Sequence, residues 1–215
     1  SVLFYGEPKS GKTSIASKFP RALLLAFEKG YNALAGVKPQ PINSWGEFLK
    51  VLKQLKDPRA KDIYETIIVD TADIAYNYCE KFICNNHGVD SIGDIPYGKG
   101  YSLVGGEFDE KLRIIVQMGY GIVLISHATD KTFKDVNGNE YNKIVLTLDK
   151  RANNIVARMT DIIGYSRAVT LIRDADIQYS RLLWEYEAGE MAINVDRDAF
   201  NYMVEDSVTN KGHSK

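Results

Sequence analysis

Two kinds of hydrophobic pattern take turns along this chain. Short runs of nearly continuous apolar residues are separated by longer stretches in which apolar residues recur every three or four positions. Continuous short runs are typical of strands buried on both faces, because a half-exposed strand alternates apolar with polar side chains. The runs predicted to be strands cover residues 2–5, 22–27, 66–69, 121–126 and 143–148.

The longer stretches predict helices over residues 12–19, 44–56, 73–85 and 107–118. The second helix opens with Ser44 and has Glu47 three residues later, a spacing typical of a capping box. The fourth is expected to end at Gly119, because glycine readily adopts the left-handed conformation that stops a helix. Strands separated by helices of this length need right-handed parallel crossovers. The pattern therefore predicts an α/β fold with a doubly wound, mostly parallel sheet.

The last quarter of the chain has a different pattern. Residues 161–171 and 178–187 are two β-rich runs joined by a short polar turn. We expect them to pair antiparallel and to extend the edge of the sheet. Residues 206–215 are polar and unpatterned, which is typical of a flexible tail. The length of 215 residues favours a single domain, over residues 1–205.

Composition is that of an ordinary globular protein, with 45% hydrophobic and 26% charged residues. The formal net charge of -1 excludes a polycation, so any nucleic-acid binding must use a local basic patch or an assembled groove. No apolar run reaches the roughly 18 residues that a membrane-spanning helix needs, and no signal peptide is recognisable. Two cysteines are too few for a disulfide-built fold and fit a reducing compartment, the cytoplasm.

The sharpest chemical signal follows the first predicted strand. There the chain matches the phosphate-loop pattern G-x-x-x-x-G-K-[ST] without a departure and then enters a helix, as the mechanism of the motif requires. The two glycines let the backbone wrap a polyphosphate, Lys12 can reach the β- and γ-phosphates, and the Thr13 hydroxyl can bind Mg²⁺. The sequence therefore predicts an ATP and Mg²⁺ site. The residues expected to contact the nucleotide are Gly6, Glu7, Pro8, Lys9, Ser10, Gly11, Lys12, Thr13 and Ser14.

Carboxylates end two of the other predicted strands. Asp70 closes the third strand, and in a parallel sheet it emerges at the same edge as the phosphate loop. We expect Asp70 to hold Mg²⁺ through water; capping of the following helix is the alternative, and both roles are compatible. Many P-loop ATPases place a glutamate directly after this aspartate, but this chain has Thr71 there. Glu28, at the end of the second strand, is the better candidate for the general base that activates water, with a plain helix-start charge as the competing interpretation.

This order of motifs resembles that of the RecA-like recombinase ATPases. In that family the phosphate loop is followed by a strand that ends in the catalytic glutamate. Next come a strand ending in aspartate plus serine or threonine and a strand ending in a polar γ-phosphate sensor. Glu28, Asp70-Thr71 and Ser126-His127 take those places in that order, and the resemblance covers roughly residues 1–150. It implies a RecA-like ATPase domain in which Glu28 and Lys12 are catalytic, His127 replaces the usual glutamine sensor, and copies assemble into a ring or filament.

A narrower resemblance is to small phage-encoded nucleotide-binding proteins linked to single-strand annealing recombination. It rests on Tyr-Gly-Lys-Gly-Tyr at 97–101, Ile-Ser-His at 125–127 and Thr-Asp-Ile-Ile-Gly-Tyr at 160–165. This resemblance implies a bare ATPase core that acts on single-stranded DNA. It also implies a phage or prophage protein in the cytoplasm of a bacterial host.

A basic and aromatic segment follows the predicted sensor, where RecA-like proteins place a DNA-contacting loop. Lys131 and Lys134 can meet phosphates and Phe133 between them can stack on a base, a combination suited to single strands. The alternative is a solvent-exposed hairpin, turned at Asn137-Gly138, whose aspartates cancel the lysines. Lys99 is a further candidate for DNA contact.

Other functions stay open at this point. One alternative is another RecA-fold motor, of helicase or clock type, and the second is a nucleotide-gated binding module with negligible turnover. Lys150 and Arg151 follow the fifth predicted strand. They either reach the γ-phosphate of a neighbouring subunit or form an ordinary solvated pair.

Overall fold

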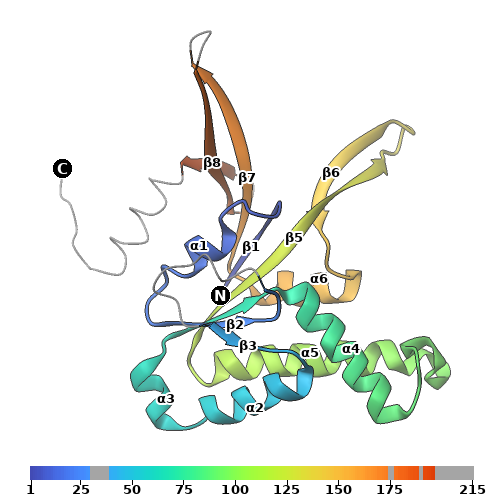
Figure 1. The fold of residues 1–215 in the computed structure, drawn as a ribbon. Helices are drawn as coiled ribbons and strands as arrows, with labels where there is room; N and C mark the ends of the chain where they lie inside the picture. The colour runs from blue at the N-terminus through green and yellow to red at the C-terminus, as the bar shows by residue number, and fades with distance from the viewer. Residues whose placement is uncertain (30–38, 174–176, 189–190, 197–215) are drawn as a thin grey trace.

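A mostly parallel sheet forms the centre of the computed structural model, which describes residues 1–29, 39–173, 177–188 and 191–196 (Figure 1). In order across the sheet, the strands are β3 (Pro39–Pro41), β2 (Ala22–Ala26), β4 (Thr66–Asp70), β5 (Gly121–Lys134), β1 (Val2–Gly6), β7 (Ile162–Arg173), β8 (Ile177–Ala188) and β9 (Met191–Asp196). From β3 to β7 all neighbours are parallel, and β8 and β9 continue antiparallel. The predicted α/β fold with an antiparallel C-terminal extension is confirmed. The predicted tail, residues 206–215, lies outside the described residues.

Each inner strand is buried on both faces, and alternate side chains enter two separate cores. In β2, Leu23 and Leu25 join a large cluster on one face, and Leu24 enters a smaller cluster on the other. β1, β4 and β5 divide their apolar residues in the same way. This two-sided burial explains why the strands appear in the sequence as continuous apolar runs.

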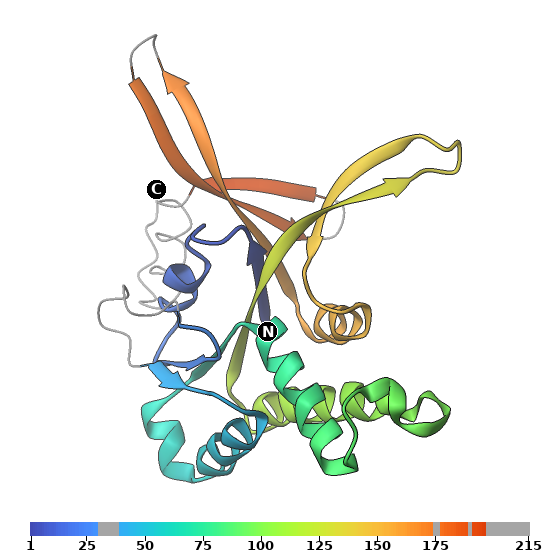
Figure 2. The same ribbon diagram turned by 45° about the vertical axis from the view of Figure 1, so that its right-hand side comes forward.

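Helices cover the two faces of the sheet unequally (Figure 2). α2, α4, α5 and α6 pack on the larger core, and α1 packs on the smaller one. Ser44 accepts a hydrogen bond from the Glu47 amide at 3.2 Å and caps α2, and Gly119 follows the end of α5 with φ of 80°, both as expected. No helix in the described part of the chain is long and apolar enough to cross a membrane. The bounds are α1 (Lys12–Ala16), α2 (Trp45–Leu55), α3 (Pro58–Ile63), α4 (Ala72–His87), α5 (Lys99–Gln117) and α6 (Lys150–Met159).

The strand predicted at 143–148 is wrong as a member of the parallel sheet. Residues Glu140–Leu146 form β6, which pairs antiparallel with the outer half of β5. A parallel strand needs a crossover of a dozen residues or more, and only the turn around Asn137-Gly138 separates β5 from β6. We call this hairpin, residues 128–146, the arm; it projects from the body of the protein (Figures 1 and 2). The parallel strand that lies beside β1, on the side opposite β5, is β7.

The helix predicted at 107–118 begins earlier, at Lys99. Three glycines, at 100, 105 and 106, interrupt its apolar pattern in the sequence. Gly100 is needed where it stands, because a Cβ there would lie 2.3 Å from the Ile92 carbonyl oxygen. Residues 99–101 therefore belong to the first turn of α5. α3 and β3 are short and carry few apolar residues, so they do not stand out in the sequence. α6 was not predicted either, although one face of it is apolar and buried.

The strand order has a switch point at the carboxyl end of β1. After β1 the chain crosses over to β2, which lies beyond the positions of β5 and β4 in the sheet. β7 lies on the opposite side of β1. At such a switch point the connections diverge, and ligands bind outside the carboxyl ends of the strands. The phosphate loop starts at this point of the fold, directly after β1.

Candidate functional site

The phosphate loop is clamped between β1 and β7. Gly6, the last residue of β1, pairs with His127 of β5 on one side and with Ser166 of β7 on the other. A Cβ on Gly6 would lie 1.9 Å from the Ser166 carbonyl oxygen, so only glycine fits there. The Ser166 hydroxyl also donates to the Ser10 carbonyl at 2.7 Å. β7 therefore holds the loop at two points, a contact that no sequence signal indicated because 156 residues separate the partners.

Lys12 lies inside the loop. It is only 5% exposed, and its Nζ donates to the Gly6 carbonyl at 2.9 Å and to the Glu7 carbonyl at 2.6 Å. Burial lowers the pKa of Lys12, and the nearby Asp70 and Glu28 carboxylates oppose that shift. The loop thus holds an ammonium group among backbone groups, and both can bind and orient an anionic phosphate.

Thr13 and Asp70 meet beside the loop, as the sequence predicts for a metal site. The Thr13 hydroxyl donates to Asp70 Oδ2 at 2.8 Å. Burial raises the pKa of Asp70 to about 6 against the effect of that hydrogen bond. Asp70 Oδ1 is buried and has no hydrogen-bond partner among the described side chains and backbone groups. A divalent cation would supply the missing partner and favour the charged carboxylate.

The donor set fits Mg²⁺. Hydroxyl and carboxylate oxygens are the hard ligands that this ion prefers. Within the described ranges no three His, Cys, Asp or Glu side chains gather into a metal cage. Mg²⁺ at Thr13 and Asp70 would therefore take its other ligands from phosphate and water, as is usual for nucleotide sites.

Glu28 and His127 form a pair next to the loop. Glu28 follows β2, His127 lies in β5 beside Gly6, and Glu28 Oε2 is 3.1 Å from His127 Nε2. The hydrogen bond to His127 lowers the pKa of Glu28 in spite of partial burial, and the same bond raises the pKa of His127. The two residues that sequence reasoning proposed as base and sensor are thus in direct contact, although 99 positions apart.

Asp73 is a residue of this site that sequence reasoning missed. Its carboxylate, in the first turn of α4, accepts from the Ser126 hydroxyl at 3.1 Å and from the His127 amide at 3.3 Å. It also accepts from the Thr147 hydroxyl, just beyond the arm. The Thr147 amide in turn donates to the His127 carbonyl at 3.0 Å. The only indication in the sequence was an acidic residue three positions after Asp70. An acidic residue in the first turn of a helix is equally well explained by its favourable interaction with the helix dipole.

The predicted DNA-contacting residues divide between two faces of the arm and a separate helix. Register pairs Lys131 with Lys143 and Phe133 with Tyr141, and strand alternation puts these four on one face. Lys134 points to the opposite face, where its Nζ is 3.0 Å from Glu140. Lys134 therefore does not share a face with Lys131 and Phe133, because neighbouring strand residues point in opposite directions. Lys99 lies on α5, outside the arm.

We expect the pKa of His127 to lie above its ordinary value, because its imidazole is hydrogen-bonded to the Glu28 carboxylate, the largest cause of this shift. The substitution Glu28→Gln should therefore lower the pKa of His127. A raised His pKa means that the pair stabilises the folded state fully below the unfolded His pKa and loses this contribution as pH rises through the folded value. On the acid side, the lowered pKa of Glu28 means that the contribution is lost as pH falls through it.

An NMR titration of the imidazole signals measures this, with His127→Gln identifying the resonance. An identical His127 pKa in the wild type and the Glu28→Gln variant would contradict the contact.

Much of this sequence is similar to that of known proteins. A family model described as AAA domain matches residues 1–189. The "SPbeta prophage-derived uncharacterized protein YorG" of Bacillus subtilis (strain 168) is 36% identical over 167 residues. The match covers 76% of this chain and 49% of that protein, so the chain spans about half the length of this curated relative.

Proposed function

This chain belongs to the AAA domain family of P-loop ATPases, and on that premise we propose that it binds ATP with Mg²⁺, hydrolyses it and acts on single-stranded DNA. One observation carries the proposal: Lys12, the Thr13–Asp70 pair and the Glu28–His127 pair converge at the carboxyl ends of adjacent strands. They supply a cation for phosphate, oxygen ligands for a metal and a carboxylate base, which are the parts that phosphoryl transfer to water needs.

Each residue has a role in this mechanism. Lys12 Nζ exchanges the Gly6 and Glu7 carbonyls for the β- and γ-phosphates. Thr13 and Asp70 would hold Mg²⁺, which neutralises phosphate charge when bound. Glu28 accepts a proton from the attacking water at a carboxylate oxygen.

The contact between Glu28 and His127 makes the base responsive to the nucleotide. While His127 donates to Glu28, the pKa of Glu28 stays low and the carboxylate is a weak base. A γ-phosphate that draws the His127 donor away raises the basicity of Glu28 at the moment when hydrolysis is possible. His127 acts in this way as the γ-phosphate sensor.

The face of the arm that carries Lys131, Phe133, Tyr141 and Lys143 is suited to single-stranded DNA. The Phe133 and Tyr141 rings stack with centroids 5.9 Å apart, and Lys131 Nζ lies 5.7 Å from the Phe133 centroid. Two lysines directly opposite each other destabilise an antiparallel pair, and a bound phosphate would offset this. Tyr141 is exposed and Phe133 partly exposed, and accessible rings flanked by cations bind single strands through stacking and phosphate contact.

The aspartates of the arm do not cancel these lysines. Asp130 lies on the opposite face by strand alternation. Asp135 is engaged in the turn, where its Oδ1 accepts from the Asn137 and Asn139 amides, both at 2.8 Å. The charges that the sequence suggested as neutralising are therefore directed elsewhere.

Asp73 connects the arm with the nucleotide site. It holds the His127 amide and the Thr147 hydroxyl at the base of the arm. A shift of His127 on ATP binding would therefore be transmitted to both ends of the hairpin, which gives a physical route from nucleotide state to DNA affinity.

We expect Phe133→Ala combined with Tyr141→Ala to weaken binding of a labelled oligo(dT) by about 10-fold or more, since stacking of one base contributes about 1–3 kcal/mol. Fluorescence anisotropy measures the affinity, and DNA-free ATP hydrolysis should persist. Thr132→Ala combined with Lys134→Ala, on the opposite face, is the matched control and should change the affinity less than about 2-fold. Equal losses in both variants would show that the face does not select the ligand.

An ATPase assay titrated with single-stranded and duplex DNA tests the proposed function as a whole. Mg²⁺-dependent hydrolysis that rises with single strands supports it. Unwinding of duplex DNA would point to a helicase-type motor, and nucleotide binding without turnover to a nucleotide-gated binding module.

The wider setting is part of the same proposal. The prophage origin named for the 36% identical relative supports a phage origin for this chain. The proposed role in recombination inside a bacterial host cell rests on the resemblance described in the sequence analysis. We further propose that residues 1–205 act as one RecA-like domain and that copies assemble into a ring or filament. Annealing of complementary single strands is one of the reactions that single-strand recombination includes.

A further inference from the structure

An open groove of about 370 Å³ runs between α5 and α6, away from the phosphate loop. Tyr101, Gly105 and Gly106 line it from α5, and Arg151, Asn154 and Arg158 line it from α6. The two arginines are seven positions apart on α6, so they face the same side about 10.5 Å apart along the helix axis. This spacing lets them contact two separate anionic groups.

Positive charge dominates the groove. Arg151 and Arg158 form no salt bridge in the described part of the chain, and both are exposed. Asp109, a carboxylate at the groove, is paired with Arg113 at 2.8 Å. The guanidinium of Arg151 lies 4.5 Å from the centroid of the Tyr101 ring. A cation beside an exposed aromatic ring is the arrangement that stacks on bases and contacts phosphates.

The floor of the groove is kept open by two glycines that internal packing does not require. Glycine inside a helix costs about 1 kcal/mol relative to alanine. A Cβ at Gly106 would meet nothing within 4 Å, and one at Gly105 would only touch Ile155 at an ordinary 3.7 Å. The side chains are absent where the molecule itself has room for them, which leaves the helix backbone accessible to a ligand in the groove.

A second ring and cation stand one turn before Tyr101. Tyr97 is 96% exposed, and Lys99 Nζ lies 5.9 Å from its ring centroid. Tyr97 also has a positive φ of 60°, a conformation that bulky residues rarely adopt and that clusters at functional sites. The basic and aromatic character therefore continues beyond the groove at the start of α5.

We propose that the groove between α5 and α6 is a second contact surface for single-stranded DNA, with Arg151 and Arg158 on phosphates and Tyr101 on a base. A nucleic-acid strand fits this groove because its phosphates recur along the backbone, as the two exposed arginines recur along α6. The inference rests on the proposed function for its ligand and goes beyond it in location.

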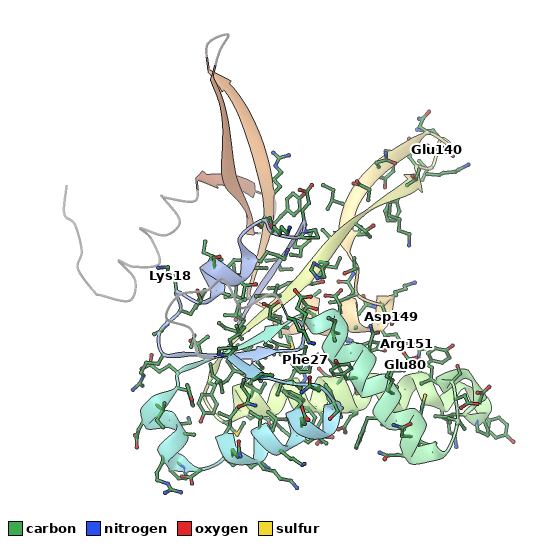
Figure 3. The ribbon with its side chains drawn as sticks, viewed as in Figure 1. Lys18, Phe27, Glu80, Glu140, Asp149 and Arg151 are labelled. Atoms are coloured by element: carbon green, nitrogen blue, oxygen red, sulfur yellow. The ribbon has the colours of Figure 1, made fainter. Side chains whose placement is uncertain are left out.

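The groove lies close to the base of the arm, so a DNA strand bound along the arm can continue into it. β6 ends at Leu146, Asp149 caps α6, and Arg151 follows within its first turn. Figure 3 shows Asp149 and Arg151 below the base of the arm, and Figures 1 and 2 agree on that placement of α6. One strand can therefore contact both surfaces.

Anisotropy titrations of a labelled oligo(dT) at several salt concentrations test the inference with the full chain. Arg151→Ala combined with Arg158→Ala should reduce the salt slope of log K by about 1.4, since each phosphate contact on a single strand contributes about 0.7. Lys50→Ala combined with Lys53→Ala, two exposed cations on α2, removes the same charge and should leave the slope unchanged. Tyr101→Ser should weaken binding several-fold, and Tyr101→Phe, which keeps the ring, should restore it.

The outcomes separate this inference from the proposed function. If the wild type binds oligo(dT) and the arginine variant matches the α2 control, the groove is not a DNA surface and the proposed function stands. If the arginine variant loses self-association in sedimentation while its DNA affinity is unchanged, the groove is an interface between copies and the inference is overturned. Absence of oligo(dT) binding by the wild type would overturn both.

Discussion

Lys12→Ala is expected to lower the affinity for ATP by about 100-fold or more, which corresponds to about 2.7 kcal/mol. Lys12 is the buried cation of the phosphate loop, and its Nζ already lies within 2.9 Å of two loop carbonyls. A charge-assisted hydrogen bond contributes about 1.5–3 kcal/mol, so the loss of one or two such bonds to phosphate accounts for the effect. Isothermal titration with ATP and Mg²⁺ measures the affinity.

The control for Lys12→Ala is Lys18→Ala, an exposed lysine just beyond α1 (Figure 3). It removes the same charge from the same region and should bind ATP like the wild type. A thermal melt of both variants separates lost affinity from lost folding. Wild-type affinity in a folded Lys12→Ala variant would remove Lys12 from the nucleotide site.

Glu28→Gln is expected to leave ATP binding almost unchanged and to reduce hydrolysis by about 10²-fold or more, as is usual when a general base is lost. Glutamine has the size of glutamate and can still hydrogen-bond His127, which lies 3.1 Å away, so the local structure should persist. What it lacks is a basic oxygen to take the proton of the attacking water. Steady-state turnover at saturating ATP, set beside the measured affinity, distinguishes a chemical defect from a binding defect.

Glu65→Gln is the matched control for this variant. Its carboxylate is exposed just before β4 and pairs with Arg21, away from the phosphate loop, so turnover should stay close to that of the wild type. Persisting turnover in Glu28→Gln would mean that another group activates water. His127, the direct partner of Glu28, would then be substituted next.

Local chemistry made much of this protein predictable from its sequence. The phosphate loop is recognisable because glycine, lysine and threonine are each required at a fixed spacing after a strand. The inner strands are recognisable because burial on both faces leaves no room for polar side chains. Asp70 follows from the same logic, since a carboxylate at the end of such a run emerges at the ligand-binding edge.

Prediction failed where one local pattern has two structural solutions. The apolar residues near 143–148 fit a buried strand and an exposed hairpin equally well, and the short turn before them decides for the hairpin. The first two turns of α5 were not predicted, because they contain three glycines, which have low helix propensity. Gly100 is there for close packing, and Gly105 and Gly106 leave open space beside the helix. In both cases the deciding factor is the space around the segment.

Residue patterns along the chain were enough to predict the class of fold, the phosphate loop and the carboxylates at the strand ends. Which residues meet became visible only in the folded chain: Glu28 with His127, Asp73 with Thr147, and Gly6 with Ser166. The fold also decided that Lys131 shares a face with Lys143 instead of Lys134. The physical reason is that local patterns encode burial and backbone conformation, whereas contacts across a sheet depend on strand order and register, which the whole chain sets together.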